Sequence, residues 1–236
     1  AALPPGHLRS VGPGWQIWAV ESFLDEIAAE LGEDPLALRL RLLDGAGKNA
    51  GEGVTAGGAK RLARVLQDVA DRSGYAEPRE PNVAVGLACS AAQERASASW
   101  TACAAEVAVD PSDGHVTVRR LTLATDVGTA VNPDGVRAQL SGAALWGLSI
   151  ALHEDVGFEA GAIQADNFDR LTPLRMWDMP QVDAAVLDSG GYPTGAGEPG
   201  VTVVAPAIGN AVARAVGARV RSLPITAEKV KAAMPA

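Results

Sequence analysis

The chain has 236 residues, of which 47% are hydrophobic and 20% are charged, so it is long enough to fold and too apolar to be a disordered tail. Its net charge of -8 argues against a nucleic-acid partner, because phosphate binding needs a basic face. No apolar run reaches the roughly 18 residues that a membrane-spanning helix requires, so no membrane span is expected.

Cysteines and histidines are too few to predict a metal site in this chain. Cys89 and Cys103 cannot supply the thiolates of an iron–sulfur cluster, and the three histidines have no metal-ligand spacing. The amino terminus has neither an initiator Met nor a basic-then-apolar signal region. The chain is therefore expected to be a processed product or a fragment, and its compartment is not specified.

Three helices are predicted in the first 80 residues, at 17–31, 34–43 and 59–72. Asp34 is the expected N-cap of the second helix, with Pro35 in its first turn. The glycine-rich residues 44–58 are predicted to be a flexible connection.

After Pro81 the hydrophobic pattern changes from a helical to an extended period. Strands are predicted at 83–89, 103–109, 115–124, 182–187 and, closing a sheet, 219–225. Helices are predicted at 134–152 and 201–216, followed by a short terminal helix. The sequence thus predicts a mixed α+β fold, with a helical segment at 1–80 and a sheet-containing core at 81–236.

Residues 195–200 read GAGEPG, which fits the glycine spacing of a dinucleotide-binding loop. The context argues against that interpretation, since no strand ends at Gly195 and no acidic residue follows at the expected distance. Glu198 would also repel a pyrophosphate. The same loop can instead present Glu198 to a ligand as a general base, because glycines let the backbone approach closely. A solvated glutamate in a surface turn is the simpler alternative.

Several segments, taken in order, resemble the molybdenum hydroxylases, the family of xanthine oxidase and aldehyde oxidase. They are 9–12, 21–26, 34–36, 126–133 with Gln139, Gly142 and Gly147, and 195–200 with the apolar segment 204–211. Residues 167–176 and 223–225 are most similar to the isoquinoline 1-oxidoreductase β-subunit group. The resemblance covers nearly the whole chain and implies a molybdopterin-binding domain.

The resemblance also implies roles for particular residues. Glu198 corresponds to the family's base beside the molybdenum, and Gln139 to a residue at the pterin. Arg9, Gly12, Gly197 and Cys103 lie in segments that approach the cofactor in relatives. Simpler interpretations remain open, namely a surface cation for Arg9, a solvated amide for Gln139 and a buried strand residue for Cys103. Val11 stands where xanthine oxidase relatives carry a substrate-contacting aromatic residue, so a wider or differently built pocket is expected.

By resemblance, the chain is the last third of a large subunit. The implied cofactor is a molybdopterin with molybdenum, in the cytosine dinucleotide form, shared with an upstream half that carries a glycine-rich loop. Iron–sulfur clusters are expected in a partner small subunit. The implied reaction inserts a water-derived oxygen into an electron-poor heteroaromatic ring or an aldehyde. A non-catalytic scaffold or assembly module and a nucleotide-binding dehydrogenase are the alternatives.

Overall fold

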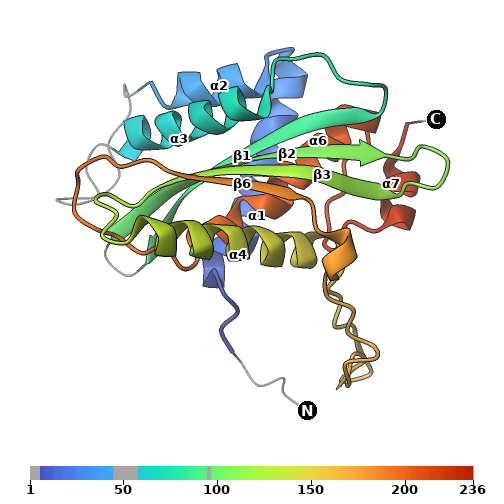
Figure 1. Cartoon of the computed structure of the whole chain (residues 1–236). Helices are drawn as coiled ribbons and strands as arrows, with labels where there is room; N and C mark the ends of the chain where they lie inside the picture. Colours follow the sequence, from blue (N-terminus) through green and yellow to red (C-terminus); the bar gives the residue numbers. More distant parts are fainter. Residues whose placement is uncertain (1–5, 45–57, 95–96, 236) are drawn as a thin grey trace.

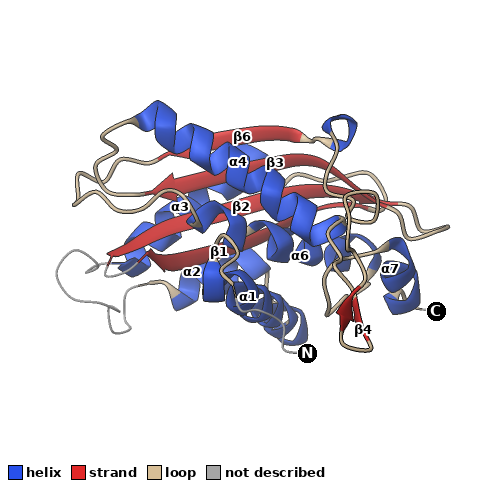
Figure 2. Ribbon diagram, turned by 90° about the horizontal axis from the view of Figure 1, so that it is seen from below, coloured by secondary structure: helices blue, strands red, loops and turns tan. Residues whose placement is uncertain are grey.

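The computed structural model describes residues 6–44, 58–94 and 97–235. A four-stranded sheet lies between two layers of helices, as Figure 1 shows from the side and Figure 2 from below. Helices α2 (Pro35–Leu42) and α3 (Gly58–Ser73) cover one face, and α4 (Pro133–Leu152) and α6 (Val204–Val216) cover the other. This arrangement agrees with the predicted mixture of helices and sheet.

The strands of the sheet follow the order β1-β2-β3-β6. Strands β1 (Val83–Glu94), β2 (Ser97–Val109) and β3 (Val116–Asp126) are antiparallel neighbours. Strand β6 (Gln181–Val186) runs parallel to β3, and α4 lies in the connection between them. The four predicted strands from 83 to 187 are therefore confirmed, although β1 and β2 are longer than their pattern indicated.

Both faces of the central strand β2 are buried. The side chain of Cys103 lies in the core formed with α4 and α6, whereas Ala102 and Ala104 lie in the core formed with α3. Side chains of successive strand residues point to opposite faces, so a strand buried on both sides shows no polar alternation. A Cβ atom at Gly86 on β1 would lie 2.2 Å from the backbone nitrogen of Ala211, so α6 lies directly against the sheet there.

The first helix, α1 (Val11–Leu31), packs on α6 and α2 beside the β1 edge of the sheet (Figure 2). It begins at Val11, earlier than predicted, because tertiary contacts override the low helix propensity of Gly12, Pro13 and Gly14. The Asp34 cap is confirmed, since its carboxylate accepts hydrogen bonds from the backbone nitrogens of Leu36 and Ala37. Residues 45–57, most of the predicted connection, lie outside the described residues.

The prediction of a strand at 219–225 is wrong, because this segment is irregular. Its arginines instead form ion pairs with carboxylates of α1: Arg219 with Asp25, and Arg221 with Glu26. The predicted helix at 201–216 is two helices, α5 (Pro199–Thr202) and α6. The short terminal helix, α7 (Ala227–Ala233), is confirmed.

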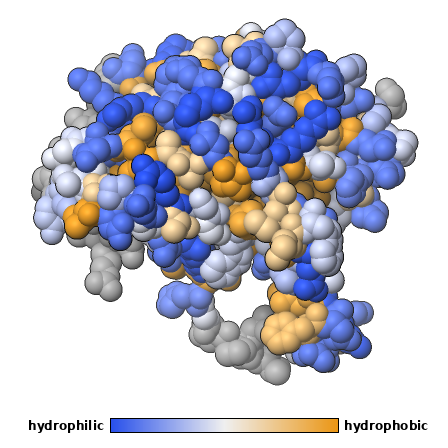
Figure 3. Space-filling model, in the orientation of Figure 1, coloured by the Kyte–Doolittle hydropathy of each residue, from blue (hydrophilic) through white to orange (hydrophobic). Residues whose placement is uncertain are grey.

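An arm formed by residues 154–180 projects from the end of α4 (Figure 1). It contains the short hairpin of β4 (Phe158–Glu159) and β5 (Ala162–Ile163), and the turn η2 (Met176–Asp178). Apolar side chains lie on its surface among hydrophilic ones, as the space-filling view shows (Figure 3). The sequence patterns did not predict this arm.

Among the described residues, one segment, Pro199–Val216, is long and apolar enough by composition to cross a membrane. In this fold, 78% of that window is buried inside the protein. Packing of α5 and α6 against the sheet and α4 accounts for its apolar composition.

Candidate active site

The residues before α1 meet the 195–200 loop and α4. The Arg9 Nε donates a hydrogen bond to the carbonyl oxygen of Gly197 (2.5 Å), and its Nη2 donates to the Gln139 Oε1 (3.0 Å). The guanidinium also lies over the ring of Trp146, 5.7 Å from the ring centre. A single arginine thus joins three segments that are far apart in the sequence.

Glu198 follows Gly197 and immediately precedes α5. Its Oε1 accepts a hydrogen bond from the backbone nitrogen of Ser10 (3.2 Å), and the residue is half-buried. Among the described residues, none donates a hydrogen bond to Oε2. One oxygen is thereby held in place while the other remains available as a proton acceptor.

The backbone beside this carboxylate is strained. Ser10 and Val11 have φ angles of 84° and 43°, in the left-handed region that non-glycine residues rarely adopt. Such a conformation costs about 1–3 kcal/mol per residue, and such residues cluster at ligand and active sites. In this conformation the backbone N–H of Ser10 points at the Glu198 carboxylate, so the geometry supports a functional site here.

A small cavity of about 50 Å³ opens beside the carboxylate, lined by Ser10, Val11, Pro13, Ala92, Glu198, Pro199 and Thr202. The hydroxyl of Thr202 is engaged with Ser90 and with the carbonyl oxygen of Pro199. Glu198 is therefore the charged group of a cavity whose walls are mostly small and aliphatic. Val11, where an aromatic residue would fill more space, is part of that wall.

Gly197 does not have a positive φ, and a Cβ atom added there would meet nothing within 4 Å. The same is true of Gly142, one helical turn after Gln139 on α4. Packing within the chain does not require glycine at either position. The open space over both glycines fits a bulky ligand that approaches the backbone.

A broad depression of about 340 Å³ extends this open region along the start of α4. Its lining includes Thr129, Asn132, Gln139, Thr194 and Ala196. These side chains and their backbone offer hydrogen-bond donors and acceptors to an extended polar ligand. Arg9 adds a positive charge: burial lowers the pKa of its guanidinium, Glu198 opposes that shift, and the group remains protonated at neutral pH.

Four predicted site residues therefore come together: Arg9, Gln139, Gly197 and Glu198. Gly12 lies nearby in the first turn of α1. Cys103 is not part of this group, since its side chain is fully buried in the core between the sheet and α6. Burial raises the pKa of its thiol far above the ordinary value, so it is not a reactive thiolate.

The geometry of the loop also bears on the nucleotide interpretation. Strand β6 ends at Val186, well before the loop, and the following helix α5 is only four residues long. A dinucleotide-binding loop joins the end of a parallel strand directly to a long helix. The described structure does not have that arrangement.

Sequence reasoning missed several residues of this site: Ser10, Ala92, Trp146 and Thr202. Ser10 lies within the 9–12 motif that resembles the family, and this motif is the sequence signal that points to it. Ala92 and Thr202 are a small strand residue and a small helix residue, whose position beside Glu198 depends on the packing of α5 against β1. No sequence pattern marks them.

A model of the molybdopterin cofactor-binding domain family matches residues 51–180, which is more than half of the chain. The chain therefore belongs to this family, as the sequence motifs predicted. Arg9 and Glu198 lie outside the matched range, so the family match does not itself assign them a role.

Two relatives are similar over most of the chain. The membrane-bound aldehyde dehydrogenase [pyrroloquinoline-quinone] of Gluconacetobacter polyoxogenes is 47% identical over 94% of this chain and 29% of its own length. Isoquinoline 1-oxidoreductase subunit beta of Brevundimonas diminuta is 33% identical over 93% of this chain and 26% of its own length. The chain thus spans less than a third of these curated relatives.

Among solved structures, aldehyde oxidoreductase from Desulfovibrio gigas matches 97% of this chain and 42% of its own chain. The TM-score is 0.76 at 16% sequence identity, so this likeness shows the fold alone. It confirms the predicted fold class, a mixed α and β molybdopterin-binding domain.

Proposed function

We propose that this chain is the base-bearing part of the large subunit of a molybdenum-dependent hydroxylase or aldehyde dehydrogenase. The observation that carries the proposal is the contact of Arg9 with Gln139 and Gly197, next to a Glu198 carboxylate with one oxygen free. When bound, the molybdopterin group supplies two-electron redox chemistry, for which the described residues offer only two buried cysteines. The chain's own residues supply binding and proton transfer.

Glu198 acts as the general base in this proposal. Its Oε2 takes the proton from the water-derived oxygen that attacks the substrate carbon, while Ser10 N–H holds Oε1. The mostly aliphatic wall beside it favours an uncharged substrate group. The substrate is an aldehyde or an electron-poor heteroaromatic ring. The small cavity contacts only the part of the substrate that lies next to Glu198.

Arg9, Gln139 and the backbone at Gly197 would hold the cofactor, in its cytosine dinucleotide form. The open glycines at 142 and 197 leave room for it. Since Arg9 already occupies the Gln139 Oε1, the amide nitrogen of Gln139 is the group directed to the ligand. Gln139 therefore binds cofactor and takes no part in proton transfer.

Gln139→Ala is expected to lower the molybdenum content of the enzyme while turnover per bound metal stays near the wild-type value. Loss of one hydrogen-bonding side chain at a cofactor weakens binding without removing the base. Metal analysis and steady-state turnover of the purified enzyme measure the two quantities. Gln67→Ala, on α3, is a matched control that should change neither. Full metal occupancy with collapsed turnover would assign Gln139 to the chemical step.

The cofactor can be identified directly in the enzyme purified with its complete large subunit. Stoichiometric molybdenum with a pterin is the expected result. The name of the Gluconacetobacter relative includes pyrroloquinoline quinone, so this quinone should be quantified in the same sample. Quinone without molybdenum would contradict the proposal, as would bound nicotinamide nucleotide. An assembled enzyme with no redox cofactor would favour the scaffold alternative.

The outer face of α1 supports a proposal about the remaining large-subunit polypeptide. Trp15, Phe23 and Leu31 are 62–64% exposed on this helix, whereas Glu21 and Asp25 are 3% and 9% exposed. A helix on a protein surface normally has the opposite arrangement. Because relatives have more than two thirds of their length outside this region, we infer that the remaining large-subunit polypeptide covers this apolar face. An iron–sulfur small subunit is the second partner we propose.

The isolated chain is therefore expected to self-associate and to bind little molybdopterin, without turnover. Sedimentation velocity of Trp15→Lys with Phe23→Glu should show a shift toward monomer. Trp177→Glu on the arm removes an aromatic side chain that is even more exposed and should leave the association unchanged. A monomeric wild-type chain, or one carrying stoichiometric molybdenum, would refute the proposed division between this chain and the remaining polypeptide.

A further inference from the structure

A buried carboxylate at the end of β3 holds the start of the loop that leads to Glu198 through a hydrogen bond. Asp126 is fully buried and accepts hydrogen bonds from Arg61 Nε (2.8 Å), Arg61 Nη2, the backbone nitrogen of Gly128 (2.9 Å) and the hydroxyl of Ser189 (2.8 Å). Burial disfavours the charged form, but these donors outweigh it and hold the pKa of Asp126 below the ordinary value. Asp126 is thus an ionised anchor with every donor supplied by the protein.

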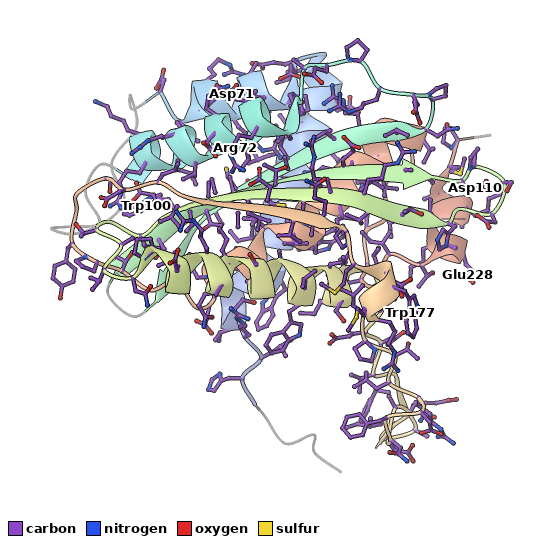
Figure 4. All side chains as sticks on the ribbon, viewed as in Figure 1. Asp71, Arg72, Trp100, Asp110, Trp177 and Glu228 are labelled. Atoms are coloured by element: carbon purple, nitrogen blue, oxygen red, sulfur yellow. The ribbon has the colours of Figure 1, made fainter. Side chains whose placement is uncertain are left out.

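The anchor is itself held rigidly. Arg61 comes from α3 and lies over the ring of Trp100, 3.6 Å from the ring centre. Trp100 is 1% exposed on β2 and lies opposite Asp126 in the register of β2 and β3. Figure 4 shows Trp100 at one end of the sheet, away from Asp110 and Glu228 at the other. Helix α3 and strands β2 and β3 therefore fix this point in common.

The loop from Ser189 to Glu198 has no secondary structure of its own. Hydrogen bonds to neighbouring segments hold it at several points. The backbone nitrogen of Thr129 donates to the Gly191 oxygen, and that of Thr194 donates to the Val127 oxygen, both at 2.8 Å. A Cβ atom at Gly128, whose φ is +73°, would lie 2.2 Å from the carbonyl oxygen of Tyr192. The 126–129 segment and the 189–194 segment are therefore packed as one unit.

Two further residues, Ser99 and Arg9, form hydrogen bonds with the same loop before Glu198. The hydroxyl of Ser99, near the start of β2, contacts the Gly195 oxygen and the Thr194 hydroxyl. Arg9 then contacts the Gly197 oxygen. A continuous series of contacts thus connects Asp126 with the residue that precedes Glu198.

We propose that Asp126, with Arg61 and Ser189, positions Glu198 by fixing the start of the 189–197 loop. The inference rests on the proposed function of Glu198 as general base. Asp126 touches neither substrate nor cofactor in this scheme, so it is a positioning residue. A base misplaced by about 1 Å loses about a hundredfold in rate, so a loop without secondary structure needs such fixed points.

The test compares Asp126→Asn with wild type in the enzyme purified with its complete large subunit. Asn keeps the shape but removes the charge that pairs with Arg61, so the loop should loosen. We expect kcat to fall about 10- to 100-fold with KM changed less than about threefold and molybdenum content unchanged. Hydrogen–deuterium exchange of peptides from 188–197 should be about tenfold faster or more, with peptides from β1 unchanged.

Two controls separate positioning from general stability. Ser189→Ala should show a smaller loss in kcat and faster loop exchange, and Ser189→Thr, which keeps the hydroxyl on an exposed residue, should restore both. Asp183→Asn on β6 removes a carboxylate that pairs with Arg72 of α3 and should alter neither measurement. If Asp126→Asn fails to fold, the Ser189 pair decides the question by itself.

Glu198→Gln, measured in parallel, separates the positioning role of Asp126 from the general-base role of Glu198. Wild-type loop exchange and kcat in Asp126→Asn, beside an inactive Glu198→Gln, would overturn the positioning role alone. An active Glu198→Gln would overturn the function on which the role rests. Faster exchange throughout the protein would show that Asp126 stabilises the fold in general and would also overturn the positioning role.

Discussion

Replacing Glu198 by Gln is expected to slow the chemical step by about two to four orders of magnitude, with molybdenum still bound. Gln keeps the size of the side chain and can still accept the hydrogen bond from Ser10 N–H. It has no basic oxygen, so the proton of the attacking oxygen has no acceptor. Rapid-reaction kinetics of substrate-dependent reduction, on preparations with equal metal content, measure this step separately from reoxidation.

A shorter acid distinguishes charge from geometry. Glu198→Asp keeps the carboxylate but withdraws it by one methylene, away from the Ser10 N–H, so its rate should be intermediate or as low as that of Gln. Glu228→Gln on α7, at the opposite end of the sheet (Figure 4), is the matched control and should react at the wild-type rate. Reduction of the Glu198→Gln enzyme at near wild-type speed would show that another group is the base.

Much of the fold follows from local patterns in the sequence. The cap at Asp34, the apolar side of α3 and the Pro133 start of α4 depend on neighbours within a few residues, and these elements form where predicted. Such signals act through backbone hydrogen bonds and one buried face. They need no knowledge of the rest of the molecule.

The errors lie where distant contacts decide the structure. Residues 219–225 have an extended pattern, but the pairing of Arg219 with Asp25 and the 2.7 Å hydrogen bond from Ile225 N to the Ala151 oxygen hold them in an irregular path. The early start of α1 likewise depends on the contact between Ser10 and Glu198, 188 residues apart. No window of the sequence contains either pair.

The candidate site divides in the same way. The family resemblance selected Arg9, Gln139, Gly197 and Glu198 from three motifs, and the fold brings them together. Their catalytic and cofactor-binding roles stay predictions. The anchor at Asp126 was not foreseen, because a salt bridge between α3 and β3 has no local signature.

Arg39→Met is expected to destabilise the fold by about 3–5 kcal/mol, which is the usual loss when one partner of a buried ion pair is removed. Arg39 is 2% exposed on α2. Its Nε donates to the Glu21 Oε2, and its Nη2 donates to the Glu21 backbone oxygen, both at 2.9 Å. Met fills a similar volume, so the loss comes from leaving the buried Glu21 and Asp25 short of a counter-charge.

The size of this loss should depend on pH. Burial raises the pKa of Glu21, and the Arg39 guanidinium opposes the rise. Without Arg39 the pKa of Glu21 in the folded state rises further above the value of about 4 that the unfolded chain has. The folded variant then holds a proton that the unfolded chain has released, so its stability falls as the pH increases through this window. Its deficit relative to wild type should therefore be smaller near pH 4 than at neutral pH.

Urea unfolding of the chain, at concentrations below self-association, gives the free energy of unfolding at each pH. Arg41→Met, on the same helix as Arg39, breaks a solvent-accessible pair with Glu33; it is the matched control and should change little. Glu21→Met combined with Arg39→Met removes both charges of the main pair, and should recover part of the lost stability because no partner is left uncompensated. A loss below about 1 kcal/mol in Arg39→Met, or one that is independent of pH, would mean that water or a rearranged Arg219 compensates the two carboxylates.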